Sequence, residues 1–396
     1  MTSFVGDNQI RLLRNGEQYF PALESAINTA KYEIHLQVYI YQADIIGERI
    51  GIALKSAANR GVNVNVLLDG FGCKDLPKKF VESLENAGVQ VMFYSPKISP
   101  WSLKKRRLRR LHHKIAVIDG DVGFVGGINI IDDYNVPNYS HNIIPPRIDY
   151  AVRIEGALLP LLLSIVQKLW HRIAWLHLRQ MNAAPMIHYS QIAHHSYNQN
   201  HPNNGIKAAL VFRDNVLHRR DIEVAYLEAI RHAKTDIIIA NAYFVPGKEF
   251  RLALLEAANR GVNVKLLLQG RMEHFLMFAT HAFYSDFLKN GIEIYEYRKS
   301  FMHSKVAVID RYWATIGSSN IDPFSLLLAR EANVLVKDTT FATELQIDIE
   351  TNIQEGASLI NSEYWAQGNI LMRGASWIAY GLVRIFLGVI GHAIEK

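Results

Sequence analysis

The chain has 396 residues, of which 49% are hydrophobic, so it is long and apolar enough for two domains with their own cores and is not extensively disordered. Its one cysteine, Cys73, excludes an intrachain disulfide and a thiolate zinc site, and is typical of a reducing compartment. The net charge of +6 favours an anionic partner, such as a nucleic acid, an anionic lipid or a phosphorylated substrate.

The N-terminal segment, MTSFVGDNQIRLLRNGEQYF, mixes polar and apolar residues without a continuous hydrophobic run. It therefore predicts neither a signal peptide nor a membrane anchor at this end of the chain. The next expected elements are a strand at 32–41, a helix that ends in Asn-Arg-Gly, and an apolar strand at 62–69. Gly61 is expected to cap that helix in the left-handed conformation. A further helix and a short strand at 89–95 follow.

This pattern of elements occurs twice in the chain. The segment ALKSAANRGVNVNVLLDG at 53–70 recurs as ALLEAANRGVNVKLLLQG at 253–270, and the octapeptide AANRGVNV is identical in both. Strands at 235–244 and 292–298 complete the second copy. Strands that alternate with helices in each copy predict an α/β fold of two tandem halves, each a mixed β-sheet flanked by helices.

The repeat predicts four segments. They are a first half at 1–179, a polar linker at 180–206, a second half at 207–345 and a C-terminal extension at 346–396. The linker is rich in Asn, His, Gln and Pro without any periodicity, which predicts a surface loop. Its histidines are irregularly spaced, so no metal site is predicted there.

Each half contains one copy of a second repeated motif, LHHKIAVIDGDVGFVGGIN at 111–129 and MHSKVAVIDRYWATIGSSN at 302–320. The matching residues are His112 and His303, Lys114 and Lys305, Asp119 and Asp310, and Asn129 and Asn320. A histidine and a lysine two positions apart on a strand project from one face, so a nitrogen nucleophile and a cation share one place. The aspartates have the opposite parity, which predicts that they lie in the turn after the strand or pair with a lysine, rather than contact the histidines.

Neither motif has both a nucleophile and an acid. Two halves facing each other would place two histidines, two lysines and two asparagines around one pocket, a set that suits a phosphodiester. The glycines near the end of each motif permit close backbone approach, and an asparagine amide can donate to an oxyanion.

These paired motifs, with RLLRNGEQYFPAL, FVGGIN and IDYAVRIEG, resemble the phospholipase D superfamily and, within it, the bacterial cardiolipin synthases of the B type, over about residues 8–340. The resemblance implies two halves related by a pseudo-twofold axis, an active site at their interface, a phosphohistidine intermediate, and neither a metal nor another cofactor. It implies that His112 is the nucleophile and His303 the general acid and base, although the near-symmetry of the motifs leaves this order open. It also implies a catalytic motif role for Lys114, Asp119, Lys305 and Asp310, and phosphate binding by Asn129 and Asn320.

The superfamily also places an acidic residue on the strand after each motif, where Asp149 and Glu331 stand in this chain. The resemblance implies that these carboxylates orient the histidines; a solvated carboxylate at a strand end is the alternative. Gln37 replaces an expected Glu and Ala329 replaces an expected Asn, so no head-group contacts are predicted from those two strands.

Three segments bear on membrane binding. A basic run precedes the first motif and suits either anionic lipid or a phosphate backbone; its cations are Lys104, Lys105, Arg106, Arg107, Arg109 and Arg110. The apolar segment 377–394 starts at Trp377 and carries Arg384 at mid-length, which favours a helix in the membrane interface over a spanning, re-entrant or dimer helix. The apolar helix at 157–178 is expected to face the core on one side and the interface on the other.

The sequence therefore predicts a peripheral enzyme on the cytoplasmic face of the bacterial inner membrane that joins two phosphatidylglycerols into cardiolipin and releases glycerol. Its expected partners are phosphatidylglycerol, other phospholipids and an anionic membrane surface. Nucleic acid is not expected, because a nuclease does not need the C-terminal apolar segment. The alternatives are a hydrolytic phospholipase D, a nuclease-type phosphodiesterase, and a membrane-binding scaffold, against which the intact motifs argue. The sequence does not predict the oligomeric state.

Overall fold

The computed structural model describes residues 2–95, 109–135, 145–176, 205–214, 218–271, 279–322 and 329–361, and the single positions 365, 374, 376, 378 and 381. In the first half the elements are β1 (Val5–Arg14), α1 (Asn15–Thr29), β2 (Glu33–Val38), α2 (Ile45–Asn59), β3 (Asn63–Asp69), α3 (Lys78–Asn86), β4 (Gln90–Tyr94), β5 (Arg110–Leu111), β6 (Lys114–Ile118), β7 (Val122–Gly126), β8 (Tyr150–Gly156) and α5 (Leu159–Leu176). In the second half they are β9 (Ile206–Arg213), α7 (Asp221–His232), β10 (Asp236–Asn241), α8 (Lys248–Asn259), β11 (Asn263–Gln269), α10 (Tyr284–Lys289), β12 (Glu293–Tyr297), β13 (Lys305–Ile309), β14 (Trp313–Gly317), β15 (Ala329–Lys337), α12 (Thr339–Gly356) and β16 (Ala357–Leu359).

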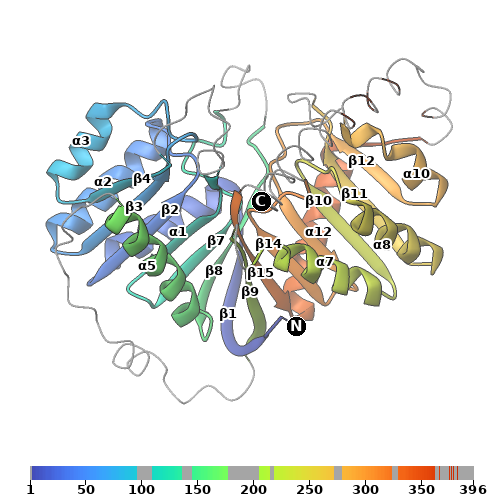
Figure 1. Cartoon of the computed structure of the whole chain (residues 1–396), viewed down its shortest axis with the longest axis horizontal. Coiled ribbons are helices and arrows are strands. Elements are labelled where there is room, and N and C mark those ends of the chain that lie inside the picture. Colours follow the sequence, from blue (N-terminus) through green and yellow to red (C-terminus); the bar gives the residue numbers. More distant parts are fainter. Residues whose placement is uncertain are drawn as a thin grey trace.

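The strands form one mixed sheet that runs through both halves (Figure 1). Its order is β16-β12-β11-β10-β13-β14-β15-β9-β1-β8-β7-β6-β2-β3-β4, and β5 pairs with β15 outside this path. The pairs β2-β3, β3-β4, β10-β11 and β11-β12 are parallel, while the strands at the centre are antiparallel. The prediction of two α/β halves with mixed sheets is confirmed, but the continuity of the sheet between them was not predicted.

The two halves meet along a seam formed by β8, β1, β9 and β15. β1 pairs with β8 along one edge and with β9 along the other, and the β1–β9 register shifts between Val5 and Asn8. The Asn8 side chain stabilises this irregularity, because its amide donates to the carbonyls of Val5 (3.0 Å) and Ile206 (3.2 Å) and accepts from the backbone of Leu158 (2.8 Å). The seam is therefore held by both backbone ladders and a buried side chain.

Helices cover both faces of the sheet (Figure 1). The helices α1, α2 and α3 share a core with one face of the first half, and α7, α8 and α10 share another with the second half. A third core crosses the seam and includes Leu162 and Val166 of α5 and Leu345 and Ile349 of α12. Burial of apolar side chains from both halves in one cluster opposes their separation.

A capping side chain and left-handed glycines fix the ends of the helices in the repeated segments. The Asp44 carboxylate accepts from the backbone of Ile46 (3.1 Å) and Gly47 (3.0 Å) and so caps α2. Gly61 and its equivalent Gly261 have φ of 89° and 90°, which confirms the predicted left-handed termination of both copies.

Some sequence predictions cannot be followed in the structure. The linker at 180–204 and nearly all of the apolar segment 377–394 lie outside the described residues, whereas Ile206 already belongs to β9. Within the described ranges, none of the helices has the length and apolar character needed to traverse a bilayer.

Candidate active site

The chain just before each motif histidine crosses the seam. Arg110 and Leu111 of β5 pair in parallel with the start of β15, and the backbone of His112 donates to the Arg330 carbonyl at 3.0 Å. In the same way, the backbone of His303 donates to the Ile148 carbonyl at 2.8 Å. Each histidine is thus fixed to a strand end of the opposite half. An acidic residue directly follows the bonded carbonyl in each case, Glu331 after Arg330 and Asp149 after Ile148.

The two predicted carboxylates each contact the histidine of the other half. His303 Nδ1 lies 2.7 Å from Asp149 Oδ2, and His112 Nδ1 lies 2.9 and 3.0 Å from the two carboxylate oxygens of Glu331. Ser318 Oγ also donates to Glu331, at 2.5 Å. The sequence indicated which acids to consider, but it gave no sign that both pairs cross between the halves.

Both motif lysines are buried beside these pairs. The Lys114 ammonium donates to the carbonyl of His112 at 2.5 Å, and that of Lys305 donates to the carbonyl of His303. Burial lowers the pKa of Lys114 to about 7 and that of Lys305 to about 8, although Glu331 and Asp149 oppose the shift. Each lysine also lowers the pKa of the histidine in the other half, so the two lysines and the two histidines are close enough to interact.

The surroundings favour the neutral form of both histidines and the ionised form of Asp149. Burial lowers the pKa of both His112 and His303, and the facing carboxylates only partly oppose this. Burial alone would raise the pKa of Asp149, but Lys305 and His303 outweigh it and lower that pKa. A neutral imidazole whose Nδ1–H bonds a carboxylate has an unprotonated Nε2, which is the form of a nucleophile or a base.

Aromatic rings that sequence reasoning missed line the two histidines. The Tyr39 ring centroid lies 4.7 Å from that of His112, and the Lys114 ammonium lies 5.3 Å from the same tyrosine ring. Phe301 stacks on His303 with ring centroids 6.0 Å apart. The position of Phe301, two residues before His303 on extended chain, was the available signal. The two histidines therefore have chemically different surroundings despite the repeated motif.

The predicted asparagines are buried at the ends of the motifs. The Asn129 side-chain carbonyl accepts from the backbone of Ile40 at 3.0 Å, which leaves its amide group as the donor for a ligand. Asn320 is also buried, next to Ile321, whose backbone donates to the Asn241 side chain at 3.2 Å.

Gln37, which departs from the resembled pattern, has a structural role. Its carbonyl oxygen lies 2.8 Å from His113 Nε2, and its amide donates to the Val166 carbonyl of α5 at 2.9 Å. It therefore ties β2 to the residue after His112 and to α5. The other departure, Ala329, uses its carbonyl to accept from Arg213 at 3.2 Å.

Asp119 and Asp310, which the resemblance places among the catalytic residues, bind backbone amides at the far ends of their strands. Asp119 accepts from the backbone amides of Lys31 (2.7 Å), Tyr32 (2.8 Å) and Glu33 (2.9 Å), and Asp310 binds the equivalent amides before β10. Each aspartate follows a strand that starts at the motif lysine, so it lies about 17 Å from it at about 3.3 Å per residue. They do not pair with lysine side chains; they fix a turn, as strand parity predicted.

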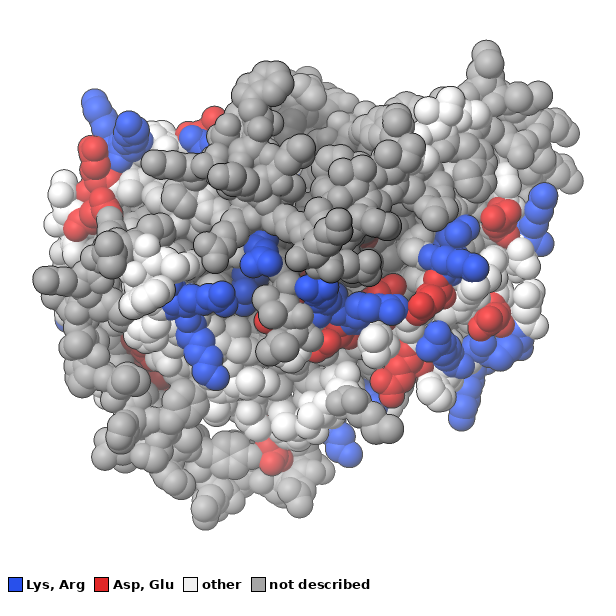
Figure 2. All heavy atoms as spheres, in the orientation of Figure 1, with Lys and Arg blue, Asp and Glu red and all other residues white. Residues whose placement is uncertain are grey.

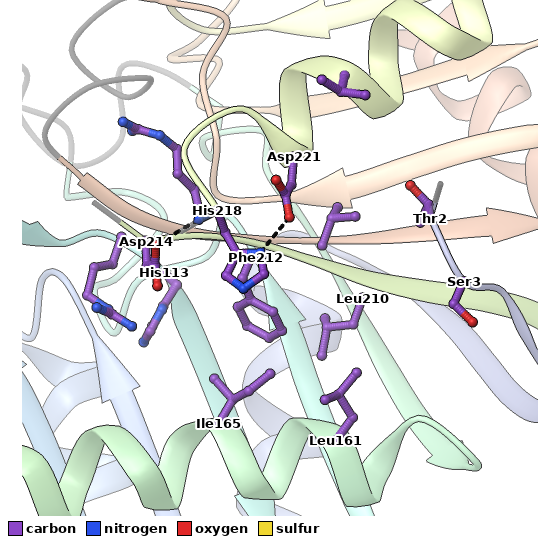
Figure 3. Close-up of a pocket in the computed structure, with 14 residues that line it drawn as sticks. Thr2, Ser3, His113, Leu161, Ile165, Leu210, Phe212, Asp214, His218 and Asp221 are labelled. Atoms are coloured by element: carbon purple, nitrogen blue, oxygen red, sulfur yellow. Dashed lines mark hydrogen bonds and ion pairs between the residues drawn. The ribbon is translucent and has the colours of Figure 1, made fainter. Parts of the chain in front are cut away.

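A cavity of about 540 Å³ lies at the seam, between α5 and α7 (Figure 3). Leu161 and Ile165 of α5, Phe212 of β9 and His113 line it, whereas His112 and His303 do not. His113 faces it because consecutive residues of extended chain point to opposite sides. The cavity is therefore separate from the paired histidines.

Of the predicted membrane-binding residues, Arg109 and Arg110 are described. Lys104, Lys105, Arg106, Arg107 and Trp377 lie outside the described residues. Among the residues that the structure describes, no group of three or more His, Cys, Asp or Glu side chains is arranged to hold a metal ion.

Sequence comparisons with known proteins agree on one family, and a solved structure shares the fold. A family model described as cardiolipin synthase, PLD-like domain, matches residues 23–149 and 226–352. Cardiolipin synthase B of Escherichia coli (strain K12) is 36% identical over 385 residues, covering 97% of this chain and 90% of the relative. The major cardiolipin synthase ClsA of Bacillus subtilis (strain 168) is 30% identical over 375 residues, covering 91% and 72%. The crystal structure of phosphatidylserine synthase from Haemophilus influenzae Rd KW20 shares the fold, with a TM-score of 0.68 and 14% identity over 100% of this chain and 96% of that one.

Because Asp119 fixes a turn, we expect its replacement to lower the stability of the protein without changing its turnover. Asp119→Ala removes three hydrogen bonds to a carboxylate and should lower the free energy of unfolding by at least about 1.5–3 kcal/mol, the contribution of one such bond. The folded variant should turn over like the unchanged protein, which urea unfolding and an activity assay well below the unfolding midpoint will measure. Asp75→Ala, at an almost fully exposed carboxylate, is the control and should change stability by less than about 0.5 kcal/mol. Lost turnover in a fully folded Asp119→Ala variant would contradict this role.

Proposed function

Because the chain belongs to the family of cardiolipin synthases with a phospholipase D-like domain, we propose that it joins two phosphatidylglycerol molecules into cardiolipin and releases glycerol. Membership of this family confirms the sequence prediction of a phosphatidyltransferase. The observation that carries the proposal is the pair of histidine–carboxylate contacts that cross the seam beside two buried lysines.

In the first step, one histidine attacks the phosphorus of the donor lipid through Nε2. A nitrogen–phosphorus bond forms and the bond from phosphorus to the oxygen of the headgroup glycerol breaks. The second histidine gives its proton to that oxygen, so free glycerol leaves and the phosphatidyl group stays on the first histidine. The second histidine must first be protonated, and the negative charge of the bound phosphodiester favours this by raising its pKa.

In the second step, the second histidine is neutral and accepts a proton from a hydroxyl of another phosphatidylglycerol. The hydroxyl oxygen attacks the phosphorus, the nitrogen–phosphorus bond breaks, and cardiolipin leaves. Following the resemblance, His112 is the nucleophile and His303 is the acid and base. Water that reached the intermediate would give phosphatidic acid instead, so exclusion of water separates transfer from hydrolysis.

Lys114 and Lys305 hold the non-bridging oxygens of the phosphate, with the amides of Asn129 and Asn320. Ammonium groups that are already buried and held in place stabilise the developing charge without reorganising. Asp149 and Glu331 compensate the two lysines while the site is empty, and they orient the histidines throughout.

We place the enzyme at the cytoplasmic face of the inner membrane, bound peripherally to anionic lipid. The substrates are bilayer lipids, and the net charge of +6 favours an anionic surface. Arg109 and Arg110, which lead into the first motif, bring part of that charge to the active site.

The reaction itself can be tested by lipid analysis. Expression of the chain in a host without cardiolipin should produce cardiolipin, and purified enzyme with phosphatidylglycerol vesicles should release one glycerol for each cardiolipin, as mass spectrometry will measure. The matched controls are His112→Ala and His303→Ala, each of which should abolish both products. Phosphatidic acid as the main product would instead support the hydrolytic alternative, and cleavage only of a nucleic acid diester would support the nuclease.

The order of the histidines can be tested with phosphatidyl-p-nitrophenol, whose leaving group needs no acid. His303→Ala should release a burst of p-nitrophenol equal to the enzyme and keep the phosphatidyl group on His112, with later turnover lower by about 10²–10⁴-fold. His112→Ala should give no burst. A burst from His112→Ala alone would reverse the order, and the absence of covalent lipid from both variants would refute the intermediate.

The lowered pKa values of the two lysines predict that kcat/KM falls as the pH rises through about 7 to 8. Because the pKa of Lys114 is about 7 and that of Lys305 about 8, each loses its proton as the pH rises through that range, and the free enzyme then binds the phosphodiester less well. Replacing both lysines by arginine, which stays protonated, should remove this limb even if the rate falls. The measurement is kcat/KM on a soluble short-chain phosphatidylglycerol across the range, and a flat profile for the unchanged enzyme would contradict the assignment.

A further inference from the structure

The last turns of α5 lie at the active-site end of the first half. Trp170 and Ile173 on the inner face of α5 share a small core with Leu111, which directly precedes His112. On the outer face, Arg172 is exposed, the Trp175 side chain is 75% exposed and Leu176 is 57% exposed. Single exposed apolar residues are ordinary, but here an indole and a leucine stand beside a cation on a helix that has no Asp or Glu.

A second exposed aromatic residue lies close to the same motif. Phe71 is 40% exposed, with the Arg110 guanidinium 5.0 Å and the Lys74 ammonium 5.5 Å from its ring centroid. Asp69 fixes this arrangement, because its carboxylate accepts from the backbone of Phe71 at 2.9 Å and from that of Leu111 at 2.7 Å. The ring is therefore held at a fixed position relative to the strand that leads to His112.

The charge of this region suits an anionic partner. Figure 2 shows Lys and Arg side chains in a band across the middle of one face, with Asp and Glu side chains beside many of them. Besides the buried Asp69, the exposed Asp75 lies 4.0 Å from Lys74, and the exposure of Asp75 and Lys74 makes this ion pair weak and easily screened.

We propose that these residues form an interfacial patch that rests on the surface of an anionic bilayer and holds the active site against the lipid headgroups. The interfacial patch consists of Phe71, Lys74, Arg110, Arg172, Trp175 and Leu176. Aromatic rings favour the headgroup region, and the cations beside them bind lipid phosphates. The proposal rests on the proposed function, in which the substrates are bilayer lipids.

A fluorescent label tests the contact directly. Cys73 is the chain's one cysteine and is buried, so a Cys73→Ser background allows a single environment-sensitive label at Trp175→Cys. Vesicles of equal parts phosphatidylcholine and phosphatidylglycerol should shift its emission to the blue and shield it from an aqueous quencher. The matched control is a label at Tyr32→Cys. Tyr32 is 58% exposed and lies beside the Asp119 turn, at the opposite end of the sheet, so a label there should not respond to vesicles. An equal response at both positions, or none at 175, would overturn the proposal.

Binding of the enzyme to vesicles, measured together with its turnover, gives a second test. Trp175→Ala with Phe71→Ala should weaken binding to the same vesicles by about 10-fold or more, a loss of about 1.4 kcal/mol. Turnover of monomeric short-chain phosphatidylglycerol should stay within about twofold, and Tyr32→Ala should change neither quantity. Unchanged partition of a folded double variant would refute the patch. If the label at 175 enters the bilayer but no cardiolipin is made, the proposed reaction is rejected and the interfacial patch is kept. If cardiolipin is made but the label does not enter the bilayer, only the interfacial patch is rejected.

Discussion

The bond between each histidine and the carboxylate of the opposite half is the contact on which the site depends. His303 needs Asp149 of the first half, and His112 needs Glu331 of the second, so neither half contains a complete pair. The strand pairing of β5 with β15, and the bridge between Ile148 and Met302, set the distances of these contacts. The continuous sheet and the shared core keep that seam closed, which is why the architecture of the whole chain bears on the chemistry of a few atoms.

The two halves repeat one motif, but the surroundings of their histidine-binding carboxylates differ chemically. Glu331 accepts from Ser318 and lies opposite Arg213, whose pKa burial lowers to about 10, still high enough to keep it charged at neutral pH. Near Asp149 the equivalent of Ser318 is Gly127, where a Cβ atom would lie 2.2 Å from the carboxylate. Different surroundings for two identical motifs are what a reaction needs when one histidine is the nucleophile and the other the acid and base.

Much of the fold and the candidate site could be predicted from the sequence. The repeat indicated two α/β halves, and the period of a strand placed each histidine beside its lysine and set Asp119 and Asp310 apart from them. The pairing of each acid with the distant histidine could not be predicted, because it depends on which strands meet across the seam. Gln37 likewise has a partner, Val166, that lies far along the chain and becomes its neighbour only when α5 packs on the sheet.

The position of β1 has a consequence for synthesis of the chain. Its edge toward β8 can be paired as soon as the first half is complete, but its other edge pairs with β9, whose residues 206–213 are made later. A first half that has just left the ribosome therefore exposes an unpaired strand edge beside apolar residues that belong to the shared core. Such an edge pairs readily with other chains, so prompt arrival of the second half protects the nascent protein from aggregation.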